Sequence, residues 1–515
     1  MSIDLGVIIA ALANVLQPWN LVFLILGVVG GLIIGIVPGL GPTMAVALLI
    51  PITYAMSPEA GLSILIAVFV GGMSGGFVTA ILIRIPGTPA SIATVLDGFP
   101  MAQQGRAGAA IGNAIVANFA GTIISAICLV TFAPLLAAFA LKFSFAEYTA
   151  VCLFAMTTVA AITGSSTSRG FITAIIGMLV ACVGLTPVDG LPRFDFGFPE
   201  LEGGLDLLPA LIGLFAVSQM MKESDRQVGA TPRPVSAMAN ILPSRRDMTG
   251  NAFNYLRSGL IGTWVGVMPA LGGGPAGLIA YAQARNASKT PERFGQGAVE
   301  GVIASETANN ATIGGALIIA LTLGIPGDPT TAVLLGGLMI HGLQPGPQLF
   351  LNNPEVLYGI YFSLFFSSVV MMLVLFLSVR ALVKVIYVPR FWLQPILIAM
   401  CVVGVFSLNN RIFDIGVMFA FGLVGYGLER LRYPLPPMVL GIVLGPLLEA
   451  NFRKMLAADG LLPLVQSPIA LTFLLLSVAS LIWAARLRRK SLPEIAKDSG
   501  SGATIRDEDD VPSRL

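Results

Sequence analysis

The chain has 515 residues, of which 56% are hydrophobic and only 11% are charged, with a mean hydropathy of +0.87. Soluble domains carry about 25% charged residues, so this composition excludes an ordinary soluble protein and indicates a membrane protein. The formal net charge of +2 gives no indication of a nucleic-acid partner. His341 is the only histidine, which excludes a histidine-based metal centre. We expect neither a metal site nor a cofactor.

Apolar segments follow one another from Leu21 to Trp483, each near the roughly 20 residues that a bilayer requires. Clear candidates are 61–85, 170–185, 205–221, 354–385, 390–407, 412–430 and 467–485. We therefore expect an all-α polytopic membrane protein with about 12 transmembrane segments. Residues 1–20 lack the features of a secretory signal. The four cysteines lie inside apolar segments and are interpreted as small buried hydrophobic residues: Cys128, Cys152, Cys182 and Cys401.

The distribution of basic residues predicts how the chain is oriented and divided. The first basic residue is Arg84, so the early loops are expected outside the cytoplasm. The long polar connection 222–257 is rich in Lys and Arg and is expected in the cytoplasm, with loop 284–294 on the same side. This predicts a first membrane half (1–221), a basic cytoplasmic loop (222–257), a second membrane half (258–485) and a disordered cytoplasmic tail (486–515).

Two elements recur in the same order in both membrane halves. "GLIIGIVPGLGPTMAVALLIP" at 31–51 is matched by "GTWVGVMPALGGGPAGLIAYA" at 262–282, and "IPGTP" at 85–89 is matched by "IPGDP" at 325–329. These elements predict helix breaks at 38–42, 86–89, 269–275 and 326–329. Because the loop before the first copy carries no basic residue and the loop before the second is strongly basic, the halves are expected to be inverted repeats.

Broken helices inside a bilayer have a physical use. Non-helical backbone survives there only where it is buried in protein or lines a wet cavity, which predicts broken helices or re-entrant hairpins. A helix that restarts after a break presents free N–H groups and the positive end of its dipole. Four such breaks near the midplane would form a cradle for a carboxylate or another small anion. Close helix packing is the simpler interpretation of "GLIIGIVPG" alone, whereas the paired Pro-Gly-x-Pro elements favour a function.

The predicted binding residues are backbone and polar groups at the breaks, together with two amides in the run "EGVIASETANNATIGG" at 300–315. They are Gly39, Gly41, Thr43, Gly87, Thr88, Ala90, Ser91, Gly272, Gly273, Asn309, Asn310, Gly327, Thr330 and Thr331. Asp328, which replaces Thr88 in the second copy, fits either a cation-coupling ligand or a helix cap. Glu300 and Glu306 fit either an interfacial position or a cavity. Asp97 is interpreted as a turn residue near the surface.

Four blocks resemble the TctA family, the large membrane subunit of the tripartite tricarboxylate transporters. They are "PGLGPTMAVALLIP" (38–51), "IPGTPASIATVLDGFPMAQQGRAGAAIG" (85–112), "KTPERFGQGAVEGVIASETANNATIGG" (289–315) and "GIPGDPTTAVLLGGLMIHGLQPGPQLF" (324–350). The sequence departs from the family pattern at "MPALGGG" and at Asp328.

The resemblance implies a secondary transporter of the bacterial inner membrane rather than an enzyme. Such proteins import citrate-like tricarboxylates, dicarboxylates or related organic acids, driven by a gradient of Na⁺ or H⁺. They work with a small four-helix membrane subunit (TctB-like) and a periplasmic solute-binding protein (TctC-like). The chain agrees in having no G-x-x-x-x-G-K-[ST] phosphate loop.

Two other functions remain open from the residues. A passive organic-anion channel is compatible with the repeat. An intramembrane aspartyl protease could use Asp97 and Asp328 as its two carboxylates, although the paired breaks would then have no explanation. The transported acid, the coupling ion and the oligomeric state are not readable from the sequence.

Overall fold

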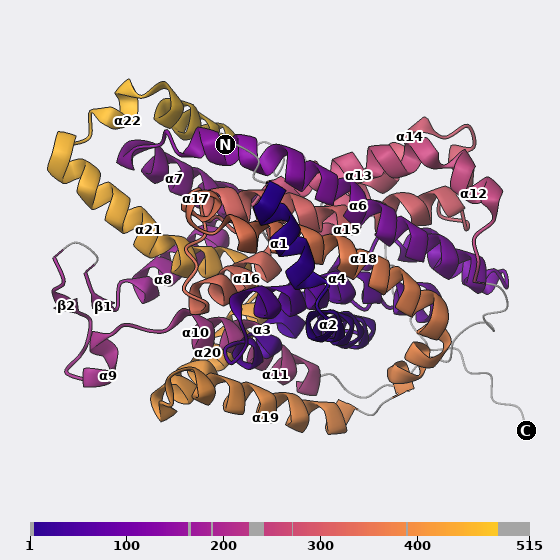
Figure 1. Ribbon diagram of the computed structural model, residues 1–515, viewed down its shortest axis with the longest axis horizontal. Helices are drawn as coiled ribbons and strands as arrows, with labels where there is room; N and C mark the ends of the chain where they lie inside the picture. The colour runs from indigo at the N-terminus through magenta and orange to yellow at the C-terminus, as the bar shows by residue number, and fades with distance from the viewer. Residues whose placement is uncertain are drawn as a thin grey trace, which may run out of the picture.

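The computed structural model describes residues 5–162, 166–186, 189–225, 241–269, 271–387 and 390–482, and these residues are almost entirely helical (Figure 1). The tail at 486–515 and residues 226–240 of the basic loop lie outside the described residues. Within the described part, the two strands β1 (Gly184–Leu185) and β2 (Pro192–Arg193) pair antiparallel as a small hairpin. An all-α architecture is therefore confirmed.

The helices of the first half have the following bounds. They are α1 (Leu5–Val15), α2 (Pro18–Ile36), α3 (Pro42–Thr53), α4 (Pro58–Ile83), η1 (Pro89–Ser91), α5 (Val95–Gln103), α6 (Ala107–Ala140), α7 (Phe145–Ile162), α8 (Thr167–Ala181), α9 (Pro199–Glu202), α10 (Leu207–Ile212), the π-helix η2 (Gly213–Val217) and α11 (Ser218–Asp225). The predicted breaks at 38–42 and 86–89 coincide with the ends of α2 and α4.

The second half begins within the basic segment. Its helices are α12 (Arg245–Gly250), α13 (Ala252–Val267), α14 (Gly273–Ala287), η3 (Pro291–Arg293), α15 (Val299–Leu323), α16 (Pro329–Ile340), α17 (Gln348–Asn352), α18 (Pro354–Leu382), η4 (Val383–Tyr387), α19 (Arg390–Asn409), α20 (Ile412–Arg430), α21 (Leu435–Asp459) and α22 (Pro463–Gln466). The breaks at 269–275 and 326–329 separate α13 from α14 and α15 from α16.

Six helices in the described part of the chain are long and apolar enough to cross a membrane. They are Pro18–Ile36, Pro58–Ile83, Ala107–Ala140, Pro354–Val385, Ile412–Arg430 and Leu435–Asp459. Shorter apolar helices accompany them. Two of these directly follow a helix break, namely Pro42–Thr53 and Pro329–Ile340. The polytopic membrane class is confirmed, and the expected number of about 12 spans stays a prediction.

Glycines bring the broken helices into backbone contact with their long neighbours. A Cβ added to Gly35 of α2 would lie 2.4 Å from the carbonyl oxygen of Gly72 in α4. In the second half, a Cβ added to Gly266 of α13 would lie 2.5 Å from the carbonyl oxygen of Thr312 in α15. No side chain larger than hydrogen fits at these positions, so small residues set the helix separation. Gly31 and Gly35 of "GLIIGIVPG" therefore have a packing role.

Asp97 lies in the core and not at a surface turn, which corrects the sequence interpretation. Its carboxylate is fully buried, and its Oδ1 accepts hydrogen bonds of 2.8 Å from the backbone N–H groups of Gly295, Gly297 and Ala298. Asp97 lies in the first turn of α5, and the loop that precedes α15 covers it. Because that loop is distant in sequence, the local composition around Asp97 gave no sign of burial.

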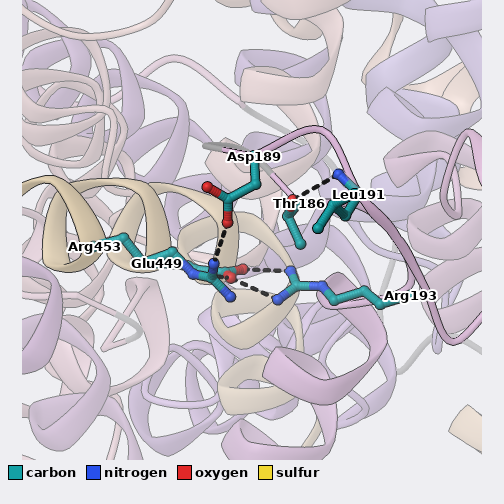
Figure 2. Close-up of polar contacts among 6 residues, drawn as sticks. All are labelled: Thr186, Asp189, Leu191, Arg193, Glu449 and Arg453. Atoms are coloured by element: carbon teal, nitrogen blue, oxygen red, sulfur yellow. Dashed lines mark hydrogen bonds and ion pairs between the residues drawn. The ribbon is translucent and has the colours of Figure 1, made fainter. Parts of the chain in front are cut away.

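The β1–β2 hairpin is held on α21 by an ionic network (Figure 2). Arg193 donates two hydrogen bonds to the carboxylate of Glu449, at 2.6 and 2.5 Å. Arg453 contacts the same carboxylate at 2.9 Å and Asp189 at 3.0 Å, while the N–H of Leu191 donates to Thr186 Oγ1 across the turn at 3.0 Å. The hairpin and α9 lie at the end of the molecule opposite α12 (Figure 1).

Candidate functional site

All four helix breaks border a single cavity of about 550 Å³. Its wall contains residues 39–43 and 88–90 from the first half, and 271–275 and 328–330 from the second half. Residues as far apart in the sequence as Gly39 and Thr330 thus meet at one place. The four breaks therefore lie around one cavity, while their place at the membrane midplane and their contact with substrate stay predictions.

Three α-helices start at this cavity. Pro42 is the first residue of α3, after Gly41, and Pro329 is the first residue of α16, after Asp328. Proline is tolerated at the first helical position because a backbone N–H there would have no partner within the helix. The third, α14, follows Gly272, whose φ of +62° is a conformation that favours glycine. The starts of α3 and α14 have no side-chain cap and present free N–H groups and the positive end of the helix dipole at the cavity, whereas the start of α16 is capped by a carboxylate.

The fourth break is built differently from the expected helix restart. After Thr88 the chain forms only the one-turn 3₁₀ helix η1, and α5 begins later, at Val95. This break contributes a buried hydroxyl, since Thr88 Oγ1 has no hydrogen-bond partner among the described residues. It does not contribute a helix dipole.

The two halves touch directly at the cavity wall. Thr43 Oγ1 at the start of α3 lies 2.9 Å from Thr330 Oγ1 in the first turn of α16. This hydrogen bond joins the first break of one half to the second break of the other. A molecule in the cavity would therefore contact both halves at once.

Most of the predicted binding residues lie on the cavity wall. The wall includes Gly39, Gly41, Thr43, Thr88, Ala90, Gly272, Gly273 and Thr330, together with Asp328. Gly87 and Gly327 do not line it and have a packing role. A Cβ added to Gly87 would lie 2.3 Å from the carbonyl oxygen of Gly35, and one added to Gly327 would lie 2.6 Å from that of Gly266.

Asp328 caps α16. Its Oδ1 accepts a 2.7 Å hydrogen bond from the backbone N–H of Thr331, and its own N–H donates to Thr331 Oγ1 at 2.9 Å, which completes a capping box. The hydroxyl of Thr331, which was predicted to contact substrate, therefore takes part in the cap. A role of Asp328 in cation coupling stays a prediction.

Asn309, Asn310 and Ser91 lie behind the wall rather than on it. Asn310 Oδ1 accepts a 2.8 Å hydrogen bond from Ser74 Oγ. Asn309 lies directly behind Gly273 of the wall, because a Cβ added to that glycine would lie 2.3 Å from Asn309 Oδ1. These amides form a polar layer that the glycine backbone separates from the cavity.

A second set of wall residues escaped the sequence analysis. It comprises Leu214, Phe215, Ser218, Gln219, Glu429, Leu435 and Pro436. Leu214 and Phe215 belong to the π-helix η2, and π-helices are frequent at functional sites. No Pro-Gly pattern in the sequence predicts this helix. Lys222 lies 3.3 Å from Glu429, an ion pair at this side of the cavity.

The wall carries few full charges. Asp328 and Glu429 are the charged residues among those that line it, and both are acidic. Any attraction for an anion must therefore come from the helix N-termini and backbone amides. A carboxylate in this cavity would be held by directed N–H groups rather than by permanent cations.

The two aspartates considered for a protease have separate roles. Asp97 accepts backbone hydrogen bonds before α15, and Asp328 is engaged in its capping box. A catalytic dyad would require the two carboxylates to face each other. Among the described residues, no group of three or more histidine, cysteine, aspartate or glutamate side chains could hold a metal ion.

The helices and the cavity define a polytopic helical membrane protein with a cavity at its helix breaks. Residues 21–440 match the Tripartite tricarboxylate transporter TctA family, and the chain belongs to this family, as its sequence blocks predict. The chain is thus related to the large membrane subunits of tripartite tricarboxylate transporters.

Two relatives come from Agrobacterium vitis. "Uncharacterized 52.8 kDa protein in TAR-I ttuC' 3'region" is 33% identical over 475 residues, which cover 91% of this chain and 94% of the relative. "Uncharacterized protein in TAR-II ttuC' 3'region" is 34% identical over 225 residues, 43% of this chain and 93% of the relative. No solved structure matches the chain.

Proposed function

We propose that this chain is the permease subunit of an ion-gradient-driven importer of tricarboxylates or related organic acids. The observation that carries the proposal is the meeting of all four helix breaks around one cavity. The uncapped N-termini of α3 and α14 there suit a carboxylate, and a volume of about 550 Å³ accommodates a small organic acid. Family membership supports the same general function.

The contacts between the halves support an inverted repeat. The helix after the second break of each half ends against the other half. The end of α5 contacts the loop between η3 and α15 through Gln104 and Gln296, at 2.7 Å. The end of α16 contacts the end of α3 through His341 and Thr53, at 3.3 Å. Such reciprocal placement is the arrangement from which alternating access works in many transporters.

The proposal includes partners and a location. We propose that the chain lies in a bacterial inner membrane and works with two partners. One is a small four-helix membrane subunit, and the other is a periplasmic solute-binding protein that delivers the acid. Membership of a tripartite family supports this assignment. We propose Na⁺ or H⁺ as the coupling ion, as expected for a transporter driven by an ion gradient.

Accumulation against a gradient tests this function. Inner-membrane vesicles containing the chain, its small membrane subunit and the solute-binding protein are expected to concentrate labelled citrate or succinate while an ion gradient is maintained. An ionophore that collapses the gradient should release the excess label. A passive channel would only equalise the concentrations, and a protease would move no label, so either result would refute the proposal.

A further inference from the structure

A second cavity, with a volume of about 860 Å³, lies apart from the cavity at the helix breaks, which is called the break cavity below. Its wall comprises parts of α7, α8, α10, α16 and α21, the end of α15, the β1–β2 hairpin with the residues that follow it, and the segment 344–348. Among the described residues, none lines both cavities. The second cavity is large enough for a small organic acid.

The two cavities lie at opposite ends of one membrane helix. Leu435, the first residue of α21, lines the break cavity, whereas residues of the second half of α21, up to Lys454, line the second cavity. At a rise of 1.5 Å per residue, Leu435 and Lys454 are separated by about 28 Å, close to the roughly 30 Å of a bilayer core. Lys454 is exposed at one end, and Glu429 of the break cavity is partly exposed at the other. The cavities therefore reach opposite faces of the membrane.

A thin apolar barrier separates the two cavities where α10, α16 and α21 pack against one another. On α16, Thr330 lines the break cavity and Leu335 lines the second, which leaves about 8 Å of helix between them. The space within this barrier, next to Ala332 and Leu440, has a volume of only about 10 Å³. This is at the lower limit of what one water molecule requires, so an organic acid cannot pass the barrier in this conformation.

The second Pro-Gly-x-Pro break forms part of the barrier. Leu323 and Gly324, at the end of α15, line the second cavity, whereas Asp328, before α16, lines the break cavity. Pro326, within the break, borders the small space between them. A few residues at the ends of helices can absorb the changes in φ and ψ that a hinge requires. The break is thus placed where a local movement would join the two cavities.

The second cavity carries basic groups that the wall of the break cavity lacks. Its charged wall residues are Arg193, Glu449 and Lys454. Arg193 and Glu449 neutralise each other in the ion pair of Figure 2. Lys454 forms no ion pair in the described part of the chain, and its ammonium group lies 5.7 Å from the centre of the Phe145 ring. Charged side chains avoid lipid tails, so this cavity is accessible to water, and its net positive charge attracts anions.

We propose that the second cavity is the entrance through which the organic acid reaches the break cavity, with Lys454 as the cation that attracts it. This inference rests on the proposed transport function. Glu429 pairs with Lys222, at the start of the basic connection 222–257, so the loop charges predict that the break cavity reaches the cytoplasmic face. The entrance then lies on the face where a periplasmic solute-binding protein would release the acid.

Access from opposite faces tests the entrance without any organic acid. In a Cys182→Ser background, Gln348→Cys places a thiol on the wall of the second cavity, and Ala90→Cys places one on the wall of the break cavity. A membrane-impermeant maleimide is added to right-side-out and to inside-out vesicles. We expect Gln348→Cys to react at least about fivefold faster in right-side-out vesicles, and Ala90→Cys at least about fivefold faster in inside-out vesicles. Any other pattern would overturn the entrance. If Gln348→Cys does not fold, the exposed Gln344 takes its place.

Protection by the acid tests the role of Lys454. Citrate or succinate, added to right-side-out vesicles, should slow the labelling of Gln348→Cys. Lys454→Gln is expected to raise the acid concentration that halves the labelling rate by about twofold to fivefold, because the lost charge is exposed. The matched control Lys142→Gln removes an exposed lysine that is not on the wall and should leave this concentration unchanged. Equal effects of the two substitutions would refute the role of Lys454.

The entrance and the transport function fail in different experiments. An acid that protects Ala90→Cys but not Gln348→Cys would refute the entrance and leave the transport function standing. Absence of accumulation in the uptake assay would refute the transport function, whereas the access experiment contains no acid and still reports on which face each cavity opens.

Discussion

Asp97→Ala is expected to lower the free energy of unfolding by about 3 kcal/mol, because three backbone N–H groups, two of them in buried residues, lose their acceptor at once. These groups belong to the residues Gly295, Gly297 and Ala298, which lead into α15. Their loss of hydrogen bonding would also loosen the contact between α5 and α15. The measurement is the unfolding of the purified chain in detergent, followed by helical circular dichroism.

Asp459→Ala provides the matched control for Asp97. Asp459 is the exposed last residue of α21 and caps no other segment in the described structure. We expect its replacement to change stability by less than about 0.5 kcal/mol. Equal stability of the Asp97→Ala and Asp459→Ala proteins would contradict the role assigned to Asp97.

Gly87→Ala and Gly327→Ala are each expected to reduce uptake by about tenfold or more. The added methyl group would lie 2.3 Å from the carbonyl oxygen of Gly35 in one variant and 2.6 Å from that of Gly266 in the other. Backbone cannot yield as a flexible side chain does, so the break must move away from the helix that it packs against, at a cost of about 1–3 kcal/mol. The cavity wall next to each glycine would move with it.

Gly30→Ala separates this steric effect from a general intolerance of alanine. Gly30 lies in α2, and a Cβ there would meet no atom within 4 Å. The uptake rate of the Gly30→Ala protein should match that of the wild type. Wild-type uptake in both Gly87→Ala and Gly327→Ala would show that the breaks do not need the close approach seen in the structure.

The positions of the breaks were predictable because proline and glycine act on their own segment of backbone. The ends of α2, α4, α13 and α15 fall where the Pro-Gly elements predict them. Thr43 and Thr330 were also predictable as wall residues, since each directly follows such an element. These predictions needed only local conformational preferences.

The remaining parts of the site depend on contacts between distant segments. Glu429 and Phe215 reach the cavity through helix packing, and no pattern near them indicates it. Asp97 has a polar neighbourhood in sequence, yet a loop of the other half covers it. Gly87 and Gly327 were predicted to touch substrate, but only the spatial arrangement reveals that carbonyl oxygens already occupy the space beside them.

Protection of a cysteine in the cavity tests the central claim most directly. In a Cys182→Ser background, Ala90→Cys places a thiol on the cavity wall, and Ala287→Cys places one on the exposed end of α14. The measurement is the rate of maleimide labelling in vesicles that accumulate citrate or succinate, with and without saturating amounts of the accumulated acid. We predict that the acid slows labelling at Ala90→Cys and leaves Ala287→Cys unchanged; an unchanged rate at Ala90→Cys would contradict binding in this cavity.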